Sequence, residues 1–189
     1  MIHDLILKNR SCRRFREDYP INEKTLLELV DLARLSASSG NMQPLKYILS
    51  CEARKNAFIF SHLRWAGYFK NWPGPGKGER PSAYIVILGD TRISQSFDCD
   101  HGIAAQSILL GASEMGLGGC MIGSIDRDGL RKALKIASYY KILLALALGK
   151  PEEKAVIETV KADNGIKYWR DARGVHHVPK RKLGDITLG

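Results

Sequence analysis

Apolar side chains recur every three or four positions over two long stretches of the chain, 22–35 and 98–115. This spacing places them along one face of a helix. The second stretch also holds Ala105 and Gly111, whose small size would let a neighbouring helix approach closely. We therefore predict two long helices, and the shorter stretches 2–7 and 127–135 predict two more.

Short apolar runs lie between these helices. They are 45–51 after Pro44, 84–88 before the turn pair Gly89-Asp90, 120–123 after a glycine-rich turn at 116–119, and 142–148 before Gly149-Lys150-Pro151. Runs of four to eight such residues bounded by turn residues are typical of buried strands. The whole pattern predicts one helix-rich domain, 1–189, with strands interspersed.

Two segments depart from this pattern. Residues 63–78 begin like a helix rich in aromatic side chains and then break into a loop of Pro and Gly. Two interpretations stay open for them: a lid-like insertion, or an ordinary surface loop packed by its own aromatic side chains. Residues 151–189 lose hydrophobic periodicity and contain only short β-like pieces such as 155–160. Such a tail cannot bury itself, so we expect an arm that extends over its own subunit or a partner.

Composition limits the compartment and the partners. No apolar run reaches the roughly 20 residues of a membrane span, and the start lacks the layout of a signal peptide, so we expect a soluble, cytoplasmic protein without a membrane partner. The four cysteines include no C-x-x-C pair, which favours reduced thiols. The formal charge of +9 would attract anionic partners, nucleotides and nucleic acids alike.

Basic residues cluster at both ends of the chain, in Arg10-Ser11-Cys12-Arg13-Arg14-Phe15 and in Val178-Pro179-Lys180-Arg181-Lys182-Leu183. Several cations with nearby hydroxyl or backbone donors suit a phosphate, although either cluster alone is more often a solvated face. A polar loop, 36–44, follows the first long helix, where a helix cap and turn would explain it equally well.

Other chemistry is not indicated by the sequence. The glycines at 116–119 follow a helix instead of a strand, which argues against a dinucleotide fingerprint, and there is no P-loop, G-x-S-x-G or H-E-x-x-H motif. The adjacent His176 and His177 would point in different directions and have no carboxylate at ligand spacing. We therefore predict no metal site and no catalytic nucleophile or general base.

Four motifs occur in an order that resembles the nitroreductase family of FMN-dependent oxidoreductases. They are R-S-x-R-x-F at 10–15, A-S-S-x-N-x-Q-P at 37–44, the glycine-rich turn and strand at 116–123, and K-R-K-L at 180–183, with a further family-like stretch at 167–171. The resemblance implies an α+β fold, a three-layer α-β-α sandwich with a mixed, mainly antiparallel central sheet. It also implies a homodimer with FMN at the subunit interface, around which the arm at 151–189 wraps.

The resemblance also implies roles for individual residues. The phosphate, ribityl chain and pyrimidine edge of FMN would be held by Asn9, Arg10, Ser11 and Arg13, with Arg13 beside N1 and O2. The partner subunit would contribute Ser38, Ser39 and Asn41, and the backbone of Ile122 and Gly123 would approach N5. The phosphate site would be closed by Lys180 and Lys182, and substrate would contact Trp65 and Trp72. The family commonly has Arg in place of Asn9 and Pro in place of Ala37. One further flavin ligand is left open among Asn71, Lys77 and Arg80.

The implied function is transfer of electrons from NADH or NADPH, through flavin N5, to an electron-poor small molecule such as a nitroaromatic or a quinone, by a ping-pong mechanism. The same flavin fold with another redox chemistry stays open: dehalogenation, dehydrogenation or flavin breakdown. A basic nucleic-acid-binding protein is a weaker alternative, because no helix-turn-helix, RNA-binding motif or zinc finger is present.

Overall fold

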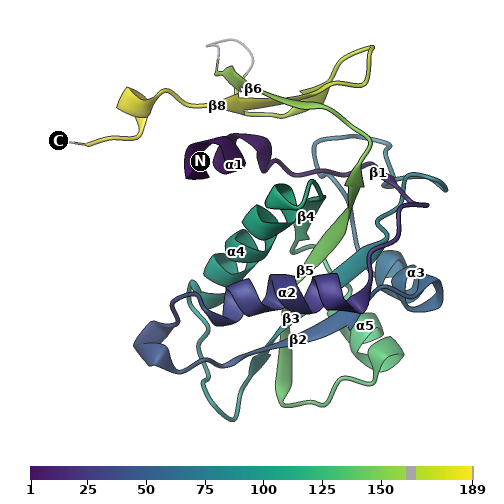
Figure 1. Cartoon of the computed structure of the whole chain (residues 1–189), viewed down its shortest axis with the longest axis vertical. Coiled ribbons are helices and arrows are strands. Elements are labelled where there is room, and N and C mark those ends of the chain that lie inside the picture. The colour runs from purple at the N-terminus through teal and green to yellow at the C-terminus, as the bar shows by residue number, and fades with distance from the viewer. Residues whose placement is uncertain (161–164, 189) are drawn as a thin grey trace.

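A five-stranded antiparallel sheet forms the centre of the computed structural model, which describes residues 1–160 and 165–188 (Figure 1). Its strands are β1 (Phe15–Arg16), β2 (Leu45–Ser50), β3 (Ala83–Asp90), β4 (Gly118–Ile122) and β5 (Tyr140–Pro151). The order is β1-β5-β3-β2, and β4 pairs with β5 as well. The long strand β5 therefore has β3 on one edge and both β4 and β1 on the other.

Helices cover both faces of this sheet. The covering helices are α2 (Glu23–Arg34), α3 (Ala53–Ser61), α4 (Asp100–Glu114) and α5 (Arg127–Leu134). The helix α1 (Ile2–Lys8) contacts α4, and two short 3₁₀ helices are η1 (Ser39–Asn41) and η2 (Leu183–Asp185). The two long helices confirm the periodic pattern. Asn22 caps α2 by accepting the backbone N–H of Thr25 at 2.8 Å. A Cβ added to Gly111 of α4 would overlap the side chain of Leu32, so glycine permits the expected close packing of α2 and α4.

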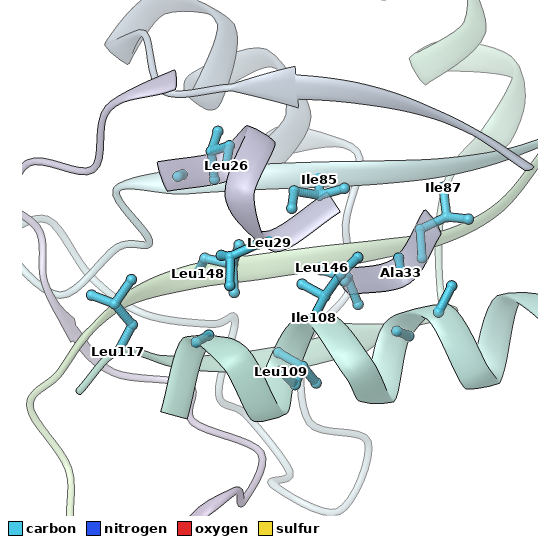
Figure 2. Packing of buried hydrophobic residues seen from close by; sticks show 14 of the residues in the cluster. Leu26, Leu29, Ala33, Ile85, Ile87, Ile108, Leu109, Leu117, Leu146 and Leu148 are labelled. Carbon is cyan, nitrogen blue, oxygen red and sulfur yellow. The ribbon is translucent and has the colours of Figure 1, made fainter. Parts of the chain in front are cut away.

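Two separate cores make the fold a three-layer sandwich. Figure 2 shows the first, where Leu26, Leu29 and Ala33 of α2 and Ile108 and Leu109 of α4 meet the sheet. The second packs α3 and α5 against the other face. All eight residues of β3 are buried, and its apolar side chains alternate between the two cores. A strand covered on both faces has a continuous apolar sequence, which is why the sequence pattern located it.

The structure corrects several predicted boundaries. The expected helix at the start of 63–78 is wrong: α3 ends at Ser61, Leu63 forms a bridge with Ile125, and turns follow over 67–71. Gly89 is not a turn residue but lies inside β3, where an added Cβ would overlap the Phe97 ring. The predicted glycine turn at 116–119 ends earlier, because β4 already begins at Gly118.

Antiparallel pairing dominates the central sheet even more than expected for a mixed sheet. All pairings between its named strands are antiparallel, and the parallel element is a single bridge between Ser11 and Gly119. A parallel pair of strands occurs instead in the arm. There, β6 (Ala155–Thr159), β8 (His176–Lys180) and β7 (Trp169–Arg170) form a small sheet in the order β6-β8-β7.

The arm lies beside α1, above the sandwich in Figure 1. It joins the body at its start, where the backbone N–H of Glu152 donates to the carbonyl of Arg14 at 3.0 Å. The predicted β-like piece at 155–160 is confirmed as β6. Residues 161–164 and 189 of the predicted arm lie outside the described residues. None of the helices in the described part of the chain is long and apolar enough to cross a membrane.

Candidate functional site

Two cavities adjoin the basic segment at 9–13. The first, which we call the Arg10 cavity, has a volume of about 260 Å³. Its lining includes Asn9, Arg10, Ser11, Arg13, Gln106, Leu109, Gly119, Met121, Tyr168, His176, Val178 and Lys180. The second, the Trp65 cavity, has a volume of about 450 Å³ and is lined by Arg13, Arg64, Trp65, Ala66, Gly67, Cys120, Met121, Ile122, Gly123, Ser124 and Tyr168. Arg13, Met121 and Tyr168 belong to both walls.

Backbone pairing brings the two ends of the chain to the Arg10 cavity. The backbone N–H of Cys12 donates to the carbonyl of Gly119 at 2.9 Å, which holds the basic segment against β4. From the arm, β8 contributes His176, Val178 and Lys180. Alternate residues of a strand face the same side, so one face of β8 supplies all three. The two basic motifs are therefore brought together, as the sequence predicted.

Arg13 lies between the two cavities, with only 8% of the residue exposed. Its guanidinium carbon is 4.6 Å from the centroid of the Tyr168 ring, and its Nη1 is 3.3 Å from Nε2 of His176. Burial lowers the pKa of His176 to about 4. At neutral pH the imidazole is therefore uncharged, Nε2 accepts from Arg13, and the proton lies on Nδ1, which has no hydrogen-bond partner among the described residues.

Glu153 holds the arm against the basic segment. One carboxylate oxygen accepts the backbone N–H groups of Arg13 and Arg14, and the other accepts from Arg170 at 2.6 Å. The side chain of Glu153 is 2% exposed. Burial, with a further contribution from Glu153, raises the pKa of the neighbouring Cys12 thiol to about 12. Cys12 is therefore protonated at neutral pH and is not a nucleophile.

The donors of the Arg10 cavity suit an anionic phosphate. Nε of Arg10 is buried and has no hydrogen-bond partner among residues 1–160 and 165–188. Burial also lowers the pKa of this guanidinium. Lys180 and Ser11 are exposed at the edge of the cavity. A half-buried cation with an unused N–H, beside a lysine and a hydroxyl, is the donor set that phosphate oxygens require.

The Trp65 cavity combines an aromatic wall with open backbone. Trp65 is 7% exposed and packs under Gly74, where an added Cβ would come within 2.6 Å of the indole ring. Ile122 is buried, whereas a Cβ added to Gly123 would meet nothing within 4 Å. The backbone at Gly123 therefore borders open space. Trp72 does not line this cavity; its ring packs against Phe69.

The other predicted ligands lie elsewhere in the single chain. Ser38 and Ser39 bind Asp100 instead, through the Ser38 hydroxyl at 2.6 Å and the Ser39 N–H at 2.9 Å. Asn41 is close to them, at the end of η1. Lys182 follows β8 and donates its backbone N–H to Asp185. Neither cavity is lined by Asn71, Lys77 or Arg80.

Tyr168 and His176 are site residues for which the sequence pattern predicted no role. Tyr168 lies in the family-like stretch at 167–171 and contacts Phe69 of the 63–78 segment at 5.2 Å between ring centroids. Sequence spacing presents His176 only as a possible metal ligand, although alternation along β8 pairs it with Lys180. The sequence has no carboxylate at ligand spacing from the two histidines, but the fold places Glu158 and Asp171 beside His177. In the described residues, no group of three or more His, Cys, Asp or Glu is arranged to hold a metal ion.

Known proteins share both the sequence pattern and the fold. The nitroreductase family model matches residues 6–67 and 69–150. An oxygen-insensitive NADPH nitroreductase of Helicobacter acinonychis is 25% identical over 205 residues, covering 87% of this chain and 94% of that protein. A 5,6-dimethylbenzimidazole synthase of Rhodospirillum rubrum is 24% identical over 170 residues, covering 77% and 79%. The solved structure of an FMN-dependent nitroreductase from Clostridium difficile matches with a TM-score of 0.64 at 26% identity, covering 85% of this chain and 91% of that one.

The matched residues contain the basic segment, the helices α2 to α5 that cover the sheet, and nearly all of that sheet. The arm after residue 150 lies outside the match. Because the family model covers well over half of the chain, and because the architecture is that of a solved family member, this protein belongs to the nitroreductase family.

Proposed function

We propose that the Arg10 and Trp65 cavities together bind FMN, and that the protein passes electrons from NADH or NADPH to an electron-poor small molecule. Family membership makes the chain an NAD(P)H-dependent oxidoreductase. One observation carries the assignment of the cofactor site: cations from both ends of the chain, Arg10, Arg13 and Lys180, line a single cavity.

The residues of the Arg10 cavity fit the anionic end of the cofactor. Arg10, Ser11 and Lys180 would hold the phosphate, and Asn9 would supply an amide where relatives commonly have a cation. The open backbone at Gly123, next to Ile122, suits a flat ring. Bound FMN would accept a hydride from the nicotinamide and deliver electrons to the second substrate.

Arg13 would tune this chemistry by its charge. A fixed cation beside the pyrimidine edge of a flavin stabilises negative charge that develops there on reduction. The neutral imidazole of His176 and the ring of Tyr168 hold the guanidinium without neutralising it. Glu153 is bound to the backbone of Arg13 and to Arg170, so its charge is already compensated by another cation.

Chemistry at the Trp65 cavity would need no nucleophile from the protein. Burial raises the pKa of both Cys12 and Cys120, so both thiols stay protonated. Trp65, Tyr168 and Met121 would instead exclude water and present apolar surface to a planar substrate. The nicotinamide that donates electrons and the small molecule that accepts them would occupy this one cavity in turn, which is a ping-pong scheme.

The homodimer would complete the cofactor site. Ser38, Ser39 and Asn41 lie away from both cavities in their own chain, as residues donated to a partner would. Next to them, Leu35 is 66% exposed and Met42 49% exposed. Burial of these two side chains against a second subunit would be favourable. Lys182, at the end of the arm, would reach the phosphate from the same or the partner subunit.

The test starts with an absorbance spectrum of the purified protein, followed by anaerobic addition of NADH and then NADPH. Flavin bands that bleach with either nucleotide are the expected result. Protein that stays colourless after incubation with FMN would contradict the cofactor assignment. Sedimentation of the same sample should show a dimer, and a monomer that binds FMN would contradict the shared site.

A different redox chemistry on the same scaffold is the second candidate. The similarity to a 5,6-dimethylbenzimidazole synthase favours it, because that protein matches nearly as well as the nitroreductases do. Steady-state turnover with a nitroaromatic, a quinone, a halogenated phenol and free reduced FMN separates the candidates. Rapid turnover of the first two supports the main proposal, whereas turnover of one of the last two alone supports the alternative.

A further inference from the structure

A third cavity, of about 250 Å³, lies between β3, α3 and the chain that leads into α2. Its walls include Glu17, Phe60, Arg80, Ser82 and Tyr84. It shares no lining residue with the Arg10 and Trp65 cavities. Binding at this third cavity would therefore be independent of the proposed flavin site and of whether FMN is bound.

Three polar atoms in its walls have unused hydrogen-bonding capacity. Nε of Arg80, the Ser82 hydroxyl and the Tyr84 hydroxyl are buried and have no partner within the described part of the chain. Tyr84 is only 1% exposed. A buried polar atom without a partner destabilises the fold, so three of them around one cavity point to a ligand that satisfies them.

The neighbouring polar groups are already satisfied. Asn56 donates to the carbonyl of Ser82 at 2.8 Å and accepts from the Ser50 hydroxyl at 2.7 Å. Glu17 accepts the backbone N–H of Gly78. Arg80 forms no ion pair with any described carboxylate, and its guanidinium lies 4.4 Å from the centroid of the Phe60 ring. The guanidinium is thus held against the aromatic wall of the cavity.

The charges of the lining select the kind of ligand. A carboxylate ligand would be attracted by the charge of Arg80 but repelled by Glu17 and Asp18, which also line the cavity. A cationic ligand would face Arg80. An uncharged primary amide avoids both repulsions and still forms hydrogen bonds, because its carbonyl accepts from the guanidinium and its NH₂ group donates to a hydroxyl. Phe60, Ile21 and Pro81 provide apolar surface for a flat body.

We propose that this cavity is a binding site for a small planar carboxamide, whose carbonyl accepts from Arg80 and whose amide group donates to Tyr84 or Ser82. The ring of such a molecule packs beside Phe60. No bond is made or broken, so the site binds and does not catalyse.

The test is a titration of the isotope-labelled full-length protein with benzamide, followed by the backbone amide signals in NMR. We expect saturable shifts centred on Asn56, Ser82 and Tyr84. Benzoate, with the same ring but a charged carboxylate, should bind at least tenfold more weakly. Absence of saturable binding, or benzoate binding as tightly as benzamide, overturns the proposal. Shifts centred on Gly123 or Tyr168 would place the ligand in the Trp65 cavity and also overturn it.

Variants connect the binding to the three polar atoms. Tyr84→Phe removes only a hydroxyl and should weaken benzamide binding about fivefold, and Arg80→Met should weaken it about tenfold. Arg54→Met is the matched control, because Arg54 lies over Phe58 as Arg80 lies over Phe60 but does not line the cavity. Ser82→Ala provides a second test if Tyr84→Phe fails to fold. Unchanged affinity in Arg80→Met and in the hydroxyl variants would refute the site.

Discussion

Replacing Glu153 by alanine is the sharpest test of how the arm is attached. The side chain of Glu153 is 2% exposed and that of Arg170, its partner at 2.6 Å, is 14% exposed. The same carboxylate accepts the backbone N–H groups of Arg13 and Arg14. The substitution therefore leaves one buried cation and two backbone donors without their acceptor.

The size of the effect follows from this environment. Removing one partner of a buried ion pair commonly costs about 3 to 5 kcal/mol, because the other charge stays buried and uncompensated. Arg170 retains contacts with the rings of Phe69 and Trp72, at 4.9 and 5.3 Å from their centroids. These contacts compensate part of the loss. We therefore expect the free energy of unfolding to fall by about 3 kcal/mol.

The assay is urea unfolding followed by tryptophan fluorescence at a fixed subunit concentration. Glu152→Ala is the matched control, because that side chain is exposed and the bond to Arg14 comes from the backbone N–H, which the substitution keeps. It should change stability by less than about 0.5 kcal/mol. The double variant with Arg170→Met should cost less than the sum of the single variants, since no charge is left unpaired. A loss below about 1 kcal/mol in Glu153→Ala, or strict additivity, would refute this role of Glu153.

Three further perturbations test the site and the arm. Arg13→Ala should lower the reduction potential of the flavin or weaken FMN retention about tenfold. An unchanged potential at full FMN occupancy would contradict the role proposed for Arg13. Trp65→Phe should alter the acceptor profile more than Trp72→Phe, which steady-state kinetics with a panel of acceptors would show. Hydrogen bonds to its two carboxylate neighbours, Glu158 first, raise the pKa of His177. That stabilisation is complete below about pH 6.5 and is lost as the pH rises through the raised pKa. The urea midpoint should fall over this window in the native protein, and the fall should be smaller in His177→Gln.

Local patterns located most of the helices and strands, because burial on defined faces determines them, although they did not predict α3. The three-layer arrangement was implied by the family resemblance. The helical spacing of 22–35 and the uninterrupted apolar run of β3 survive in the structure almost unchanged. The predicted helix after Leu63 is absent: Leu63 pairs with Ile125 instead, and the chain continues through turns over 67–71. The pair Gly89-Asp90 predicts a turn locally, but the Phe97 ring packs over Gly89 in the folded chain and requires a glycine inside the strand.

The sequence by itself determined the family, the two covered faces of the sheet, and the cations at both ends of the chain. Only the tertiary structure decided which of those cations meet. It placed Lys180 in the Arg10 cavity, because Lys180 shares a face of β8 with His176 and Val178. It left Lys182 outside, because β8 ends at Lys180 and the chain turns there into η2. It also gave His176 a neutral ring through burial, and collected Arg80, Ser82 and Tyr84 around a separate cavity. Burial and unused hydrogen-bonding capacity depend on residues distant in the sequence, so no local pattern contains them.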